Sequence, residues 1–172
     1  MTTITSVGAG IWTADLTRTR AAFTARHLFG QTVQGTIAVT GGTLHVGPDG
    51  QPRRFQATLD PASISTGNIR RDADLRGRRF LDAGTFPLME AAADGIDVVA
   101  AGQWRTDAVL RVRRSEAPLR IEAKLDILPA GARLLVSGTA RLDLRDAGIR
   151  VPGFLVRRFV DLSFSAQLTR QT

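Results

Sequence analysis

The stretch Pro118-Leu-Arg-Ile-Glu-Ala-Lys-Leu-Asp-Ile127 (PLRIEAKLDI) decides the fold. From Leu119 to Ile127 every odd-numbered residue is apolar and every even-numbered residue is charged. Successive side chains of a β-strand point to opposite faces, so this alternation places all the apolar side chains on one face. The stretch therefore predicts a β-strand with one face in a core and the other in water.

The same alternation continues after this strand and recurs before it. Residues 132–144 and 160–169 repeat it, and less regular strands are predicted near residues 10–17, 20–27, 33–46, 52–60, 87–93, 96–103 and 107–114. The segments are separated by turn-forming residues such as Pro48-Asp49-Gly50 and Asp94-Gly95. Nine or ten short strands with little room for crossover helices predict an all-β, antiparallel sheet, which removes its exposed edges by closing into a barrel.

One stretch, Thr66–Asp82, lacks strand alternation. Ile69, Leu75 and Phe80 have spacings closer to helical turns, and Asn68 is a residue type that caps helix N-termini. We expect a short helical excursion near residues 67–79, lying across one end of the barrel.

Length and composition fit a single domain covering residues 1–172. The chain has no cysteine, which excludes disulfides and thiolate chemistry. The first ten residues lack the basic and apolar regions of a secretory signal, and no apolar run is long enough for a transmembrane helix. These features predict a cytoplasmic protein.

The formal net charge is +7, and Lys124 is the only lysine, so the basic residues are almost all arginine. One interpretation is a bias toward arginine on solvated strand faces. The other is an anionic partner, because the flat guanidinium group suits phosphate and carboxylate contacts.

Signatures of catalysis are missing from the sequence. Two histidines, His27 and His45, are too few for an imidazole metal site, and no GxSxG motif occurs. Asp72 and Asp74 stand beside arginines, which favours ion pairs over an acid–base dyad. We expect no enzymatic activity, no metal and no required cofactor.

Three features are candidates for ligand binding, each with a structural alternative. His27 ends a predicted strand, where it either makes a structural hydrogen bond or touches a polar group of a ligand. An aromatic and methionine set either fills the core or lines a cavity; its members are Phe23, Phe29, Phe80, Phe86, Met89 and Trp104. A cluster of arginines either forms a solvated helix face or binds an anion; its members are Arg70, Arg71, Arg76, Arg78 and Arg79, of which Arg70, Arg76 and Arg79 are the predicted ligand contacts.

Three segments resemble the YceI-like family of polyisoprenoid-binding, lipocalin-like barrel proteins. They are Trp12-Thr13-Ala14-Asp15, ARHLFGQTVQGTI at 25–37, and ATLDPASISTGNIRRDADLRGRRFLDAGTFPLM at 57–89. The third is the longest and most specific match. The second half departs from the family, since LRVRRSEAPL at 110–119 keeps little of the usual hairpin and RDAGI at 145–149 lacks the usual aromatic residue.

The resemblance implies a closed, lipocalin-like antiparallel barrel of about eight strands around a tunnel for a polyprenyl chain or isoprenoid quinone. Some of the nine or ten predicted strands must then be halves of bent strands. Each buried methylene of such a ligand contributes about 0.8 kcal/mol, so few polar contacts are needed. The expected partners are an isoprenoid-type molecule and an anionic membrane surface, and a homodimer is compatible with the sequence.

The competing hypothesis is an arginine-rich barrel that is filled with side chains and acts as an adaptor for an anionic partner such as nucleic acid, membrane or protein. A nucleic-acid barrel needs exposed aromatic residues beside its basic ones. Most of the ten aromatic residues fall on predicted inward faces. We therefore expect no nucleic-acid binding.

Overall fold

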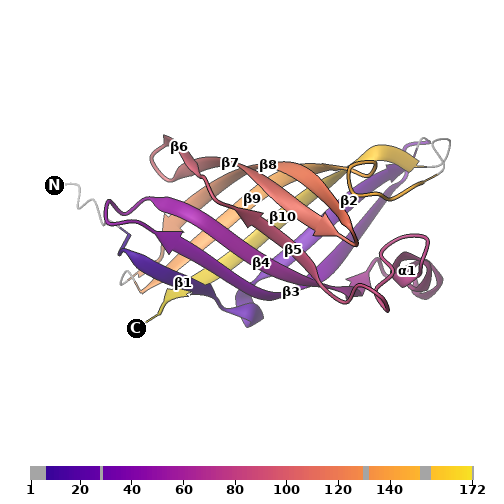
Figure 1. Cartoon of the computed structure of the whole chain (residues 1–172), viewed down its shortest axis with the longest axis horizontal. Coiled ribbons are helices and arrows are strands. Elements are labelled where there is room, and N and C mark those ends of the chain that lie inside the picture. The colour runs from indigo at the N-terminus through magenta and orange to yellow at the C-terminus, as the bar shows by residue number, and fades with distance from the viewer. Residues whose placement is uncertain (1–6, 28, 130–131, 152–155, 172) are drawn as a thin grey trace.

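The computed structural model describes residues 7–27, 29–129, 132–151 and 156–171, and within them ten strands form one antiparallel sheet (Figure 1). The strands are β1 (Gly10–Ala14), β2 (Arg20–His27), β3 (Thr32–Val46), β4 (Pro52–Ser65), β5 (Met89–Ala93), β6 (Asp97–Ala100), β7 (Gln103–Val112), β8 (Ser115–Ile127), β9 (Arg133–Asp143) and β10 (Val156–Arg170). The described helices are the 3-10 turn η1 (Leu16–Arg18) and α1 (Ile69–Arg76).

Eight strands close into a barrel in the order β2-β3-β4-β5-β7-β8-β9-β10. Closure comes from β10, which pairs with β9 on one side and with β2 on the other. All the pairings are antiparallel, and they confirm the predicted all-β, lipocalin-like barrel of about eight strands. The sheet therefore has an inside and an outside.

The two additional strands are parts of broken strands. β10 pairs with β2 from Val156 to Ser165 and then with β1 from Leu168 to Arg170, so β1 and β2 follow each other along one edge. β5 and β6 pair with β7 in the same way, at successive positions. Ten strands and an eight-stranded barrel are thus compatible, as expected from the sequence.

Several predicted strand boundaries are wrong: β4 runs to Ser65 instead of residue 60, β10 begins at Val156 instead of residue 160, and two other boundaries differ for local reasons. The strand predicted to reach residue 17 ends at Ala14, because the Asp15 carboxylate accepts hydrogen bonds from the backbone N–H and hydroxyl of Thr17 and turns the chain. The break predicted between residues 103 and 107 lies at Ala101-Gly102, where Gly102 adopts a φ of 68°. Trp104 therefore belongs to β7.

Helix α1 lies at one end of the barrel, within the predicted excursion (Figure 1). Its N-cap is Asn68, whose side chain accepts a hydrogen bond from the backbone N–H of Arg71 at 3.0 Å. Both ends of the described chain lie at the opposite end of the barrel (Figure 1). None of the described helices is long and apolar enough to cross a bilayer.

The buried residues form two clusters. The first follows the inner faces of β7, β8 and β9 and includes Leu110, Leu119 and Leu142. The second brings Trp12, Trp104 and Leu134 together near the chain ends, and we call it the closed-end cluster; it also contains Leu44, Val46, Val136 and Leu168. The Trp12 indole N–H donates to the carbonyl of Gly8 at 2.9 Å.

Leu134 and Leu135 provide a direct test of the strand faces. Leu134 is fully buried in the closed-end cluster. Leu135, the next residue of β9, points to the other face of the sheet and is only half-buried. Leu134→Ala should lower the free energy of unfolding by about 2–5 kcal/mol, because it leaves a cavity in a packed core. Leu135→Ala should lower it by less than half as much in the same urea titration. Equal losses would contradict the assigned faces.

Candidate ligand cavity

The barrel encloses a cavity of about 1100 Å³. All eight barrel strands contribute inward-facing side chains to its wall, among them Ile37, Leu59, Ile121 and Leu162. This volume exceeds the roughly 300–1,000 Å³ of pockets for drug-sized ligands. The period-two alternation of the strands makes the wall apolar, so the cavity suits a long apolar molecule.

Two glycines keep large aromatic rings against the wall. Phe23 pairs across the sheet with Gly35, and Phe164 pairs with Gly138. A Cβ atom on Gly35 would lie 2.2 Å from Cζ of Phe23, and one on Gly138 would lie 2.6 Å from Cζ of Phe164. Each ring therefore covers the glycine opposite it instead of crossing the barrel, which leaves the centre open.

The cavity opens at the end that carries α1, which we call the mouth. Its lining there includes Asn68, Arg70, Arg78 and Arg79, all of which are exposed. At the other end the lining reaches Trp104 and Leu168, members of the closed-end cluster. The cavity is thus an apolar hollow whose charged lining residues lie at the mouth.

Helix α1 is held at the mouth by hydrogen bonds to the end of β4. The buried Asp72 carboxylate accepts from the backbone N–H of Thr66 at 2.8 Å and from its hydroxyl at 2.6 Å. Arg71 donates to the same hydroxyl at 2.8 Å, and Arg76 donates to the carbonyl of Ile64 at 3.0 Å. The hydrogen bonds from Thr66 lower the pKa of Asp72, and the charges of Arg76 and Arg71 act in the same direction.

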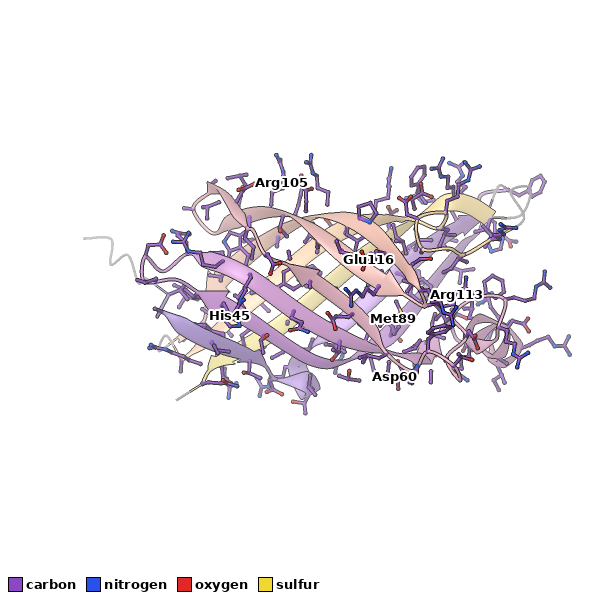
Figure 2. The ribbon with its side chains drawn as sticks, viewed as in Figure 1. His45, Asp60, Met89, Arg105, Arg113 and Glu116 are labelled. Atoms are coloured by element: carbon purple, nitrogen blue, oxygen red, sulfur yellow. The ribbon has the colours of Figure 1, made fainter. Side chains whose placement is uncertain are left out.

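Arg113, in the turn between β7 and β8, joins two segments that border the mouth (Figure 2). Its guanidinium donates to the carbonyl of Gly148 at 2.5 Å and to that of Arg78 at 3.3 Å. The turn after β9 buries Leu144, Ala147 and Ile149 in the larger cluster. Arg113 therefore ties this turn to the segment that follows α1.

The structure brings seven of the ten predicted ligand contacts to the cavity. They are Phe23, His27, Arg70, Arg79, Phe80, Met89 and Trp104. His27 ends β2 close to the mouth, Met89 begins β5, and Trp104 lies at the closed end (Figure 2 labels Met89). These positions span the cavity from opening to base.

The other three predicted contacts lie elsewhere. Phe29 is 89% exposed, because it sits in the turn before Gly30, where the inward and outward alternation of the strand has ended. Phe86 is half-buried under the guanidinium of Arg114, which lies 5.8 Å from the ring centre. Arg76 is turned toward β4 by its hydrogen bond to Ile64.

Two lining aromatic residues, Phe55 and Phe164, are missing from the predicted ligand contacts, and the lining also includes Arg71 and Arg78, which belong to the predicted arginine cluster but not to its three predicted contacts. The alternation of apolar and polar residues along 160–168 predicts that Phe164 faces inward, so the sequence does indicate this residue. The four lining hydroxyls on Thr19, Thr43, Thr106 and Ser163 also went unnoticed; Thr19 and Thr106 donate to backbone carbonyls. Among the described residues, no group of three or more metal-ligating side chains occurs.

A closed antiparallel barrel with an apolar cavity that opens at one end defines a lipocalin-like ligand-binding protein. A YceI-like domain model matches residues 12–168, and the chain belongs to this family. No curated protein matches the chain.

Solved structures share the fold at low identity. BcnA of Burkholderia cenocepacia is 14% identical, with a TM-score of 0.77 over 90% of this chain and 98% of its own. A polyisoprenoid-binding domain from Saccharophagus degradans, described as implicated in plant cell wall breakdown, is 12% identical, with a TM-score of 0.73 over 95% and 100%. The Campylobacter jejuni YceI protein is 15% identical, with a TM-score of 0.71 over 86% and 90%.

Gly138→Val tests the arrangement of ring and glycine. The new side chain should push the Phe164 ring into the cavity, which leaves less room for the ligand. Each methylene of a prenyl quinone that no longer fits in the cavity costs about 0.8 kcal/mol, so the affinity should fall about fourfold per methylene. Equilibrium titration measures this. Gly95→Val is the control, because its Cβ would enter open space. Unchanged affinity in Gly138→Val would refute the arrangement.

Asp72→Asn tests the attachment of α1. The lowered pKa means that the carboxylate stabilises the fold above its ordinary pKa of 3.8, and that this stabilisation is lost as the pH falls through the lowered value. Wild type should therefore be more stable than Asp72→Asn at pH 7, and the difference should shrink below pH 3.8 in thermal unfolding. The exposed Asp74→Asn on the same helix should unfold like wild type at both pH values.

Proposed function

We propose that this protein binds an isoprenoid-type lipid, a polyprenyl chain or isoprenoid quinone, and sequesters or carries it inside the barrel. The main observation behind this proposal is the cavity of about 1100 Å³ with its apolar wall. Membership of the YceI-like family supports it, as does the fold shared with a polyisoprenoid-binding domain. Burial of a long chain there gains about 0.8 kcal/mol per methylene without any polar contact.

The lipid would enter tail first, because the charged lining residues lie at the mouth. The head group would then lie among Arg70, Arg78 and Arg79, with His27 nearby on β2. Hydrogen bonds between guanidinium groups and an anionic head contribute about 1.5–3 kcal/mol each. A diphosphate head would gain more from this opening than an uncharged quinone.

The side chains of the cavity favour binding over catalysis. Among the described residues, the lining contains one histidine, His27, and one carboxylate, Asp74. A nucleophile activated by a neighbouring base is the usual requirement for covalent catalysis. The adaptor hypothesis required a barrel filled with side chains, which does not fit a cavity of this size.

Tryptophan fluorescence offers a sharp test, because the chain has two tryptophans and one of them lines the cavity. Titration with a prenyl quinone should quench or shift the emission of Trp104. Trp12→Phe should keep this response and Trp104→Phe should abolish it, since both residues belong to the closed-end cluster but Trp12 lies outside the cavity lining.

Native mass spectrometry of the purified protein, followed by organic extraction, should identify a co-purified lipid. A protein that carries no lipid, and whose fluorescence and melting temperature stay unchanged at saturating quinone and prenyl diphosphate, would refute the proposed function.

A further inference from the structure

The net charge of the protein lies at the mouth. Residues 26–27, 29–32, 66–88, 111–116, 141–151 and 156–161 lie at this end of the barrel and hold 14 of the 23 basic residues but only 7 of the 16 acidic ones. The rest of the chain holds nine of each. The whole excess of +7 is therefore concentrated around the opening of the cavity.

Six of the arginines at the mouth have no side-chain partner among the residues that the structure describes. Six are exposed, and none makes an ion pair or donates a side-chain hydrogen bond within the described part of the chain: Arg70, Arg78, Arg79, Arg145, Arg150 and Arg157. On the barrel wall away from the mouth, by contrast, Arg53 pairs with Asp49 and Arg120 pairs with Asp107. These six arginines are thus free, within the described residues, to contact an external anion.

Two large apolar side chains project from the same end. Phe29, in the turn between β2 and β3, is 89% exposed, and Ile69, the first residue of α1, is 91% exposed. No other large apolar side chain among the described residues exceeds 54% exposure. Apolar groups this exposed, set among cations, are typical of a surface that meets an interface between water and lipid.

We propose that the mouth docks on the surface of an anionic lipid bilayer. The six free arginines would contact lipid phosphates, while Phe29 and Ile69 enter the boundary between head groups and acyl chains. The cavity would then open directly onto the membrane. This proposal does not rest on the identity of the bound lipid, because Phe29, Ile69 and three of the six arginines (Arg145, Arg150 and Arg157) lie outside the cavity lining.

Charge and side-chain chemistry favour a bilayer over other partners. Two copies meeting mouth to mouth would bring two strongly positive ends together. A nucleic acid would satisfy the arginines, but single strands bind to a series of aromatic rings on which successive bases stack, and of the two projecting side chains Phe29 offers one ring and Ile69 offers none. Phe159 is also exposed, but the guanidinium groups of Arg141 and Arg158 lie 5.9 and 5.3 Å from its ring centre.

Vesicle co-sedimentation tests the docking surface with the whole protein. The vesicles are phosphatidylcholine alone, or phosphatidylcholine mixed with phosphatidylglycerol, and both lack isoprenoids. We expect binding to the anionic vesicles only, with a steep loss as salt shortens the Debye length from about 30 Å at 0.01 M to about 3 Å at 1 M. Since the vesicles contain no proposed ligand, this result is independent of the proposed function.

Matched variants locate the surface. Arg78→Ala with Arg79→Ala should weaken binding roughly fivefold per arginine, the equivalent of about 1 kcal/mol each. Phe29→Ser with Ile69→Ser should also weaken binding to the anionic vesicles. Its loss relative to wild type should be larger at high salt, because the charges are then screened and the apolar contacts provide more of the affinity. The controls away from the mouth are Arg54→Ala with Arg133→Ala for charge and Leu16→Ser with Val99→Ser for exposed apolar residues; both should bind like wild type.

Several results would overturn the proposal. Equal binding to neutral and anionic vesicles would remove the role of charge, and equal losses in mouth and control variants would remove the role of the mouth. Binding of single-stranded DNA without vesicle binding would assign the surface to nucleic acid. A dimer in size-exclusion chromatography that Phe29→Ser with Ile69→Ser disperses, again without vesicle binding, would assign it to a second copy.

Discussion

Closure of the sheet through β10 is the constraint on which the rest of the structure depends. Because β10 pairs with both β9 and β2, every inward side chain faces a common interior and every outward one faces solvent. An eight-stranded barrel is just wide enough to be filled by its own side chains or to hold one small ligand. Here the interior holds small residues such as Ala91, Ala123 and Ala140, and it leaves a cavity.

The size of that cavity depends on where bulk is placed. Phe23 and Phe164 are large enough to fill the centre, but each lies over the glycine opposite it. Further bulk lies in the two buried clusters, one near the chain ends with Trp12, Trp104 and Leu134 and a larger one along β7, β8 and β9 with Leu110, Leu119 and Leu142. Members of both clusters line the cavity, so the packed residues form its wall and leave its centre open.

Alternation predicted the faces of the strands well and the ends of the strands poorly. The pattern from Leu119 to Ile127 determines which side chains face inward, because parity is a local property of an extended chain. Phe29 lies past the end of β2, where parity no longer applies, and its exposure depends on the turn at Gly30. The roles of Arg76 and Arg113 depend on backbone carbonyls remote in the sequence, so no local pattern could indicate them.

The position of the chain ends has a practical consequence for experiments on this protein. Gln171 donates its backbone N–H to the carbonyl of Ile11 at 2.8 Å, so the first and last strands meet at the closed end. A fluorescent label, an affinity group or a surface tether attached beside this pair of strands would lie at the end of the barrel opposite the opening. A molecule immobilised in this way would present its cavity to the solution.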